Sequence, residues 1–139
     1  MPNDRGTYAA LALYLSMGHG TNQQTILVVE DDAIIRMSSV ATLEDAGFCV
    51  FAAKNSADAI EMMSRHGEIE IMLTDVRMPG SMDGLALTTR TRADYPAIRT
   101  IVISGNATAK QASDAGASGF VAKPYLPATI LQAIHDTVL

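Results

Sequence analysis

The chain has 139 residues, of which 48% are hydrophobic, no tryptophan, and a formal net charge of −5. This length suits a single domain with an aliphatic core of its own. The absence of a Lys/Arg cluster excludes a nucleic-acid surface. The longest uncharged apolar stretch, residues 8–17, is shorter than the roughly 20 residues that cross a bilayer, which excludes a membrane-spanning helix. We therefore expect a cytoplasmic protein that binds neither nucleic acid nor membrane.

Residues 1–24 are predicted to form an N-terminal extension and linker, because the regular pattern of the chain begins only at residue 25. Residues 8–17 fit a short helix, and residues 18–24 fit a linker. An equally good account is that translation starts at Met17. The sequence leaves both alternatives open.

From residue 25 onward, short β-branched runs alternate with helix-compatible stretches. The expected strands are 26–29, 49–53, 69–74, 100–104 and 119–122, and the expected helices are 33–46, 56–65, 83–94, 108–115 and 127–138. Such alternation favours a parallel sheet with crossover helices. We expect one domain over residues 25–139 and no second folded domain.

The first helix, 33–46, carries apolar side chains on two faces. One face holds Ile35, Leu43 and Ala46, and the other holds Ile34, Met37 and Ala41. Both faces could pack on the core, or the second could be an apolar docking surface. Cys49, the one cysteine, lies in an apolar run, so we expect a buried, reduced thiol rather than a disulfide or metal ligand.

Charged and hydroxyl side chains stand where the expected strands end. The first strand runs into Glu30 and Asp31, the third into Asp75, the fourth into Ser104 and the fifth into Lys123. Since the carboxyl ends of parallel strands share one edge, these groups are expected to meet there. Asp32 is expected to cap the helix that follows.

Carboxylates gathered in this way repel one another unless a cation or a proton lies between them, and a hard divalent ion such as Mg²⁺ is the usual answer. With Mg²⁺ present, a carboxylate can act as a nucleophile and form an aspartyl phosphate. A lysine and a hydroxyl group would then stabilise the transferred phosphoryl group. The residues at the strand ends include every part of such a site.

The chain resembles the receiver domain of bacterial two-component response regulators, of the stand-alone type. The resemblance covers about residues 25–139. The segments that carry it are 26–32 (Ile-Leu-Val-Val-Glu-Asp-Asp), 73–75 (Leu-Thr-Asp), 78–79 (Met-Pro), 82–84 (Met-Asp-Gly), 103–105 (Ile-Ser-Gly) and 119–125 (Gly-Phe-Val-Ala-Lys-Pro-Tyr). It implies a flavodoxin-like, doubly wound fold: a five-stranded parallel sheet in the order 2-1-3-4-5 with helices on both faces.

The resemblance also implies a role for each site residue. Asp75 would be the phosphoacceptor, and Mg²⁺ would be held by Glu30, Asp31, Asp75 and the backbone carbonyl of Arg77. Ser104 would be the switch hydroxyl. Lys123 would pair with the phosphate and precede a cis peptide bond to Pro124.

Three further positions are read through the same resemblance. Phe120 matches the switch aromatic residue but lacks the hydroxyl group of a tyrosine. Arg77 and Asn106 occupy the two positions that tune dephosphorylation, and we expect the phosphoryl lifetime to change when Arg77 is replaced. The loop after Asp75 is one residue longer than the commonest form, because it carries Gly80 and Ser81.

The expected function is that of a response regulator, not an enzyme with a substrate of its own. A histidine kinase or histidine phosphotransfer protein would donate the phosphoryl group, and a downstream protein would read the result, with the chain a monomer or a phosphorylation-dependent homodimer. Three alternatives are weighed: an interaction module that is never phosphorylated, an Asp-nucleophile phosphatase of the haloacid-dehalogenase type, and a flavin-binding protein of the same strand order.

Overall fold

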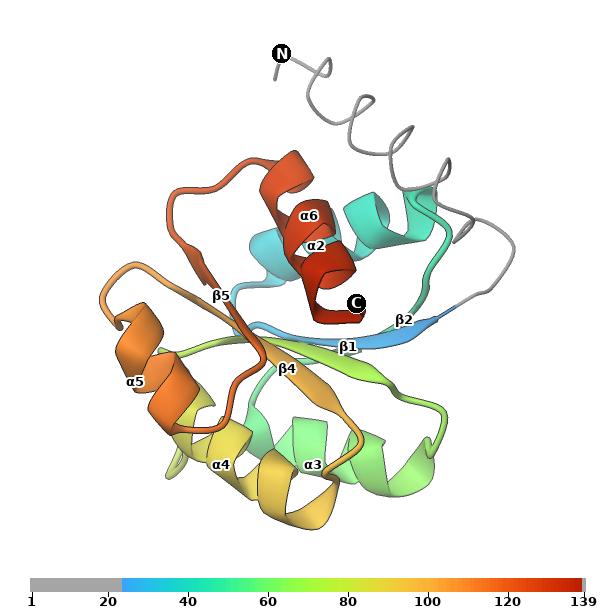
Figure 1. Ribbon diagram of the computed structural model, residues 1–139. Helices are drawn as coiled ribbons and strands as arrows, with labels where there is room; N and C mark the ends of the chain where they lie inside the picture. The colour runs from blue at the N-terminus through green and yellow to red at the C-terminus, as the bar shows by residue number, and fades with distance from the viewer. Residues whose placement is uncertain (1–23, 139) are drawn as a thin grey trace.

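The computed structural model describes residues 24–138 (Figure 1). Its elements, in chain order, are β1 (Thr25–Val29), α2 (Ala33–Asp45), β2 (Cys49–Ala53), α3 (Ser56–Arg65), β3 (Ile71–Asp75), α4 (Gly84–Asp94), β4 (Arg99–Ser104), α5 (Ala109–Asp114), β5 (Gly119–Ala122) and α6 (Pro127–Val138). Apart from Gln24, the segment 1–24 for which an extension was predicted lies outside the described residues.

The strands form one parallel five-stranded sheet in the order β2-β1-β3-β4-β5, as predicted. The order reverses direction after β1, so the carboxyl ends of β1 and β3 flank the switch point where ligands bind in open α/β sheets. In the pairing register, Val29 lies beside Thr74, Asp75 beside Ile103, and Ser104 beside Ala122. Glu30, Asp75, Ser104 and Lys123, which end a strand or directly follow one, therefore lie at the same edge of the sheet.

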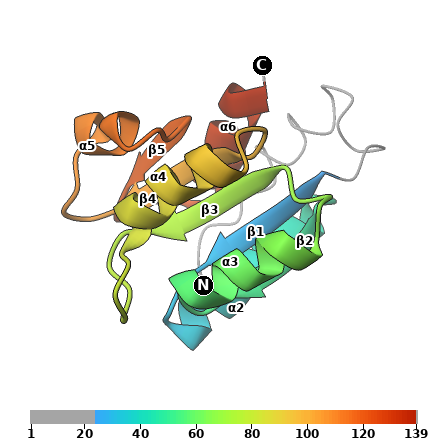
Figure 2. The same cartoon turned by 90° about the horizontal axis from the view of Figure 1, so that it is seen from below.

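Helices cover both faces of the sheet. Figures 1 and 2 show α2 and α6 on one face and α3 and α4 on the other. Alternate residues of a strand point to opposite faces of the sheet and contribute to two separate cores. Ile26 and Val28 pack with α2 and α6, whereas Leu27 and Val29 pack with α3 and α4. Burial on both faces explains why the strands read as continuous apolar runs.

Local signals fix where the helices begin. Asp32, Asn55, Asp83 and Thr108 are N-caps whose side chains accept hydrogen bonds from backbone N–H groups of the first turn. Asp32 accepts from two of them, Ile34 N at 2.9 Å and Ile35 N at 3.0 Å, as predicted. None of the helices in the described part of the chain is long and apolar enough to cross a membrane.

Two burial predictions need correction. Cys49 is exposed rather than buried, because β2 is an edge strand and Cys49 stands at its start. Core packing of both faces of α2 is also wrong: Leu43 and Ala46 are buried, but Ile34 is 80% and Met37 70% exposed, and Ala41 is exposed too. The second apolar face of α2 therefore lies open to solvent.

Candidate functional site

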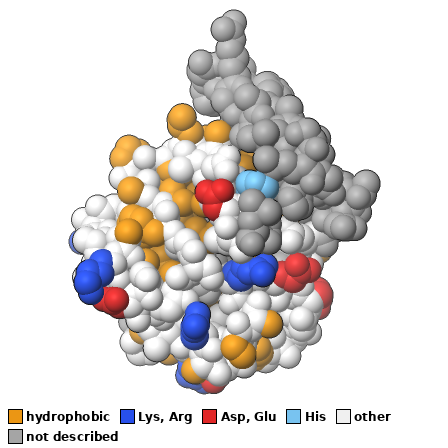
Figure 3. All heavy atoms as spheres, viewed as in Figure 1, with side chains coloured by type: hydrophobic (Ala, Val, Ile, Leu, Met, Phe, Trp, Pro, Cys, Tyr) orange, Lys and Arg blue, Asp and Glu red, His pale blue; other side chains and the backbone are white. Residues whose placement is uncertain are grey.

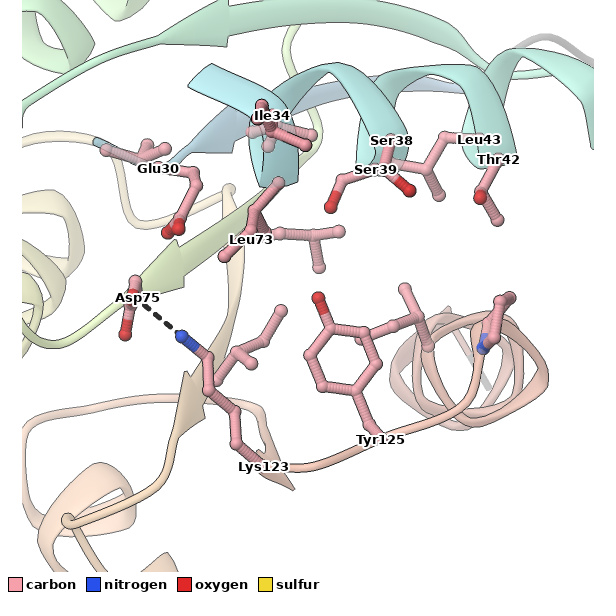
Figure 4. Close-up of a pocket in the computed structure, with 16 residues that line it drawn as sticks. Glu30, Ile34, Ser38, Ser39, Thr42, Leu43, Leu73, Asp75, Lys123 and Tyr125 are labelled. Carbon is pink, nitrogen blue, oxygen red and sulfur yellow. Dashed lines mark hydrogen bonds and ion pairs between the residues drawn. The ribbon is translucent and has the colours of Figure 1, made fainter. Parts of the chain in front are cut away.

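Three carboxyl groups come together at the carboxyl edge of the sheet. Glu30, Asp31 and Asp75 each offer an oxygen atom, and these atoms lie within 4.8 Å of one another. Glu30 is buried, Asp75 is half-buried and Asp31 is exposed, so the cluster opens outward on the side of Asp31. Figure 4 shows Glu30 and Asp75 facing each other across the ends of β1 and β3.

The buried Glu30 carboxyl has an abnormal protonation equilibrium. Burial, a hydrogen bond with Asp75 and the negative charge of Asp75 together raise its pKa from 4.5 to about 7. Near neutral pH, Glu30 therefore holds a proton for part of the time. A cation bound at the cluster would displace this proton.

The carboxylate of Asp75 is held by two donors. Lys123 Nζ donates to Oδ2 at 2.8 Å and the backbone N–H of Val76 donates to Oδ1 at 2.8 Å. Burial lowers the pKa of Lys123, but the hydrogen bond and the charge of Asp75 outweigh it, and the pKa is raised. Lys123 is thus a permanent cation, and the Lys123–Pro124 bond that follows it is cis, as predicted.

Ser104 is buried at the end of β4, and its hydroxyl group accepts hydrogen bonds from the loop that follows this strand. The Oγ atom accepts from Asn106 N at 3.1 Å and from Ala107 N at 2.9 Å. Phe120 is half-buried on β5, opposite Val102. Both residues lie on strands beside the site, and their switch roles stay predictions.

Arg77 and Asn106 contact each other across two loops. With the Asn106 amide oriented so that its oxygen faces the guanidinium, Oδ1 accepts from Arg77 Nη2 at 2.9 Å and from Nε at 3.0 Å. This pair links the loop after Asp75 to the loop after Ser104. The two positions to which the family resemblance assigns the tuning of dephosphorylation are therefore joined by hydrogen bonds.

A glycine sets the path of the loop that follows Asp75. A Cβ on Gly84 would stand 1.8 Å from the carbonyl oxygen of Asp75, so no other residue fits there. The backbone N–H of Gly84 donates to Val76 O at 2.8 Å, which closes the loop. Gly84 allows the start of α4 to pack against the backbone of the Asp75 strand end.

Two residues at the site were missed by the sequence reasoning. Arg36, on α2, donates a hydrogen bond from Nη1 to the backbone oxygen of Glu30 at 2.8 Å, which ties α2 to the end of β1. Tyr125 lines a pocket with Lys123 and Glu30 (Figure 4). Its place two residues after Lys123 was a usable signal, whereas nothing in the sequence pairs Arg36 with the Glu30 carbonyl.

The sequence matches the response regulator receiver domain over residues 26–135. The chain belongs to this family.

Its relatives range from whole proteins of similar length to parts of much longer ones. A chemotaxis protein CheY homolog of Campylobacter jejuni is 28% identical over 81% of this chain and 91% of its own length. The sensor kinase CckA of Brucella abortus is 37% identical over 73% of this chain, but only 11% of that protein is matched. The chain spans between about a tenth and a half of several such curated relatives.

Solved receiver structures agree with the fold. A response regulator receiver protein of Sinorhizobium medicae superimposes with a TM-score of 0.75 at 31% identity, covering 85% of this chain and 96% of that one. A CheY-like receiver domain protein of Methanospirillum hungatei gives a TM-score of 0.77 at 25% identity, covering 84% and 94%. The receiver fold predicted from the motifs is confirmed.

The donor set of this receiver domain fits Mg²⁺. The three clustered groups are carboxylates, the hard oxygen ligands that this ion prefers, and the exposed side at Asp31 leaves room for its water ligands. Glu30, Asp31 and Asp75 would hold the ion, with the backbone carbonyl of Arg77 as the further ligand implied by the family. The soft or nitrogen ligands that favour zinc are absent from this cluster.

Proposed function

We propose that Asp75 accepts a phosphoryl group from a histidine kinase or histidine phosphotransfer protein, in a reaction that requires Mg²⁺. The observation that carries this proposal is the placement of Asp75, which lies 2.8 Å from the ammonium of Lys123 and within 4.8 Å of two further carboxyl groups. A nucleophile, a phosphate-pairing cation and a metal-binding set are thus gathered around one carboxylate.

In the proposed step, a carboxylate oxygen of Asp75 attacks the phosphorus atom of a phosphohistidine. The new P–O bond forms as the P–N bond breaks, and the imidazole leaves with the electron pair and takes up a proton. Lys123 stabilises the negative charge on the phosphoryl oxygens, and bound Mg²⁺ supplies further charge neutralisation. Asp75 is consumed and restored in each cycle, so the chain acts as a phosphoacceptor rather than as an enzyme with a separate substrate.

Output follows from a shift between two packings of the loop after β4. The phosphoryl group brings up to about two negative charges and three acceptor oxygens. Ser104 leaves its contacts with Asn106 and Ala107 to donate to it, and Phe120 moves into the space that opens. The altered surface is read by a downstream protein or by a second copy of the chain, in the cytoplasm.

The exposed face of α2 is the proposed contact for the phosphodonor. Ile34 and Met37 are apolar and solvent-exposed, Ala41 continues the same face, and the helix begins three residues after Glu30. An apolar surface beside the nucleophile suits a protein donor that must bring its histidine to Asp75.

The test is modification of the full chain by acetyl phosphate, with and without Mg²⁺, read by intact mass. We expect one phosphoryl adduct that depends on Mg²⁺ and is lost in Asp75→Asn; size-exclusion chromatography of the adduct then reports whether it dimerises. A chain that stays unmodified beside a receiver that is modified overturns the proposal in favour of an unphosphorylated interaction module. Sustained hydrolysis of phosphate esters would instead indicate a phosphatase.

A further inference from the structure

Arg36 contacts the backbone of the acidic turn rather than its carboxylates. Its Nη1 atom donates to the backbone oxygen of Glu30 at 2.8 Å and, over a longer distance of 3.4 Å, to that of Asp31. Among residues 24–138 it forms no ion pair with a carboxylate. Glu30 follows the last paired residue of β1, so its carbonyl lies beyond the ladder of the sheet and takes Arg36 as a partner.

A cation is an unexpected residue at this place in α2. Arg36 is the fourth residue of the helix and its only cation, and a positive charge near a helix N-terminus opposes the helix dipole. The neighbouring surface is apolar: Ile34 and Met37 are exposed, and hydrophobic side chains gather over the β5–α6 loop (Figure 3). Neither helix stability nor an ion pair therefore accounts for Arg36, whereas its hydrogen bonds to the acidic turn do.

The acidic turn has to be held because it carries two of the three clustered carboxylates. The carboxylate of Asp31 is exposed and has no hydrogen bond or ion pair in the described part of the chain, so its position depends on its backbone. The N–H group of Glu30 donates to Ala53 O at 3.0 Å, and the side chain of Asp32 caps α2. Arg36 holds the carbonyl groups between these two points.

We propose that Arg36 is a positioning residue for Mg²⁺: by fixing the backbone of Glu30 and Asp31, it keeps their carboxylates where they can bind the ion together with Asp75. The inference rests on the proposed function, because it takes Mg²⁺ as the ion of the site. In this role Arg36 contacts neither the ion nor the phosphoryl group. Its charge alone would have the opposite effect, because a nearby cation repels Mg²⁺. The sign of the change when Arg36 is replaced therefore separates positioning from electrostatics.

The test compares the Mg²⁺ affinity of Arg36→Met with that of the natural full chain, measured from amide NMR shifts during a titration with magnesium chloride. Methionine is a good helix former but has no hydrogen-bond donor. We expect the dissociation constant for Mg²⁺ to rise about tenfold or more, as is typical when a group that orients metal ligands is removed.

Lys54→Met is the matched control for the lost charge. Lys54 is exposed and directly follows β2, the strand that pairs with β1, so it lies at the same edge of the sheet. This variant should bind Mg²⁺ as tightly as the natural chain or slightly more tightly.

Two further variants and a second measurement make the test independent of one protein. Arg36→Gln has a shorter side chain and should also weaken Mg²⁺ binding, even if Arg36→Met fails to fold. Arg36→Lys keeps a donor and should recover most of the affinity. Without Mg²⁺, the carbonyl carbon resonance of Glu30 should move upfield in Arg36→Met and Arg36→Gln, because the carbonyl loses its hydrogen bond.

Natural or tighter Mg²⁺ binding in Arg36→Met and Arg36→Gln overturns the inference, and so does an equal loss in Lys54→Met. An unchanged Glu30 carbonyl resonance would remove the contact on which it rests. Lower stability in urea with unchanged Mg²⁺ affinity would also overturn it, because Arg36 would then only stabilise the fold. If the natural chain itself bound no Mg²⁺, the proposed function and this inference would both fail, whereas an affinity shared by the natural chain and Arg36→Met would remove the inference alone.

Discussion

Glu30 is a buried carboxyl group beside a second carboxyl group, and this placement makes its contribution to stability depend on pH. Its pKa is raised from 4.5 to about 7 in the folded protein. The folded state therefore binds more protons than the unfolded state between these values, and the stabilisation is complete below about pH 4.5 and lost as the pH rises through about 7. A bound cation should reverse this trend, because it binds the deprotonated form.

We predict that, without Mg²⁺, the stability of the natural chain relative to Glu30→Gln falls between pH 5 and pH 8, by on the order of 1–3 kcal/mol. Urea unfolding followed by circular dichroism measures the difference at each pH, and the comparison cancels the other titrating groups. With saturating Mg²⁺ the natural chain should gain stability at pH 8 and the Gln variant much less. A difference that does not change with pH would show that Glu30 titrates normally.

Gly84 is a position where one methyl group decides the geometry of the site. Its Cβ would overlap the carbonyl oxygen of Asp75, so Gly84→Ala must displace the start of α4 or the strand end. We predict a loss of stability on the order of 3 kcal/mol or more and a strong decrease in Mg²⁺ affinity. Gly67→Ala is the matched control, because a Cβ there has nothing within 4 Å. Similar stabilities of the two variants would contradict the close approach.

Among the elements, the loops after β3 and β4 are joined by the hydrogen bonds between Arg77 and Asn106. Arg77 follows Asp75 by two residues, and we expect its charge to hinder the water molecule that would attack a phosphoryl group on Asp75. We predict that Arg77→Ala shortens the phosphoryl lifetime about threefold or more, a change of roughly 0.7 kcal/mol in the barrier.

Because Arg77 acts together with Asn106, the double variant Arg77→Ala with Asn106→Ala should lower the hydrolysis barrier by less than the sum of the two single variants. Loss of the acetyl-phosphate-derived adduct with time, followed by intact mass, gives each rate. Unchanged hydrolysis in Arg77→Ala would refute the role, and strict additivity would refute the coupling.

The apolar face of α2 yields a second prediction at this scale. Met37→Glu should slow phosphotransfer from a kinase or phosphotransfer protein by about tenfold or more, since a charge at the centre of an apolar contact is costly. The rate with acetyl phosphate should not change. Ala57→Glu, which adds the same charge to an exposed position of α3, should slow neither reaction. Equal rates for Met37→Glu and Ala57→Glu with the protein donor would remove α2 from the docking surface.

How far the sequence could predict these elements depended on the range of the interactions involved. Helix starts at Asp32 and Asn55 were predictable because capping is local. The exposure of Cys49 was not predictable, because an apolar run does not say whether its strand lies at an edge of the sheet. The strand order itself came from the family resemblance.

Contacts between distant segments were harder still. The hydrogen bonds between Arg77 and Asn106 and the pocket that Tyr125 lines arise where distant segments meet, and no periodicity within one segment predicts them. The carboxylate cluster was predictable for a different reason: its members follow strands whose ends must share an edge.

The whole domain has two cores, one on each face of the sheet. The strands that carry Glu30 and Asp75 contribute side chains to both cores. Ile134 is buried in the core under α2 and α6, and Leu87 is buried in the core under α3 and α4. Neighbouring residues of each strand enter opposite cores, so neither core can open without disrupting the strands that end in Glu30 and Asp75. The domain should therefore unfold as one unit.

We predict that Leu87→Ala lowers the free energy of unfolding by about 3 kcal/mol and Ile134→Val by about 1 kcal/mol. Because the sheet separates the two sites, the double variant should show their sum within about 0.5 kcal/mol, with an unchanged dependence on denaturant. Urea unfolding gives these energies, and native-state hydrogen exchange at amides of α3 and α6 shows whether both faces open together. If Leu87→Ala accelerated exchange in α3 but left the slowest amides of α6 unaffected, the two faces would unfold separately. The acidic site would then be anchored by one core alone.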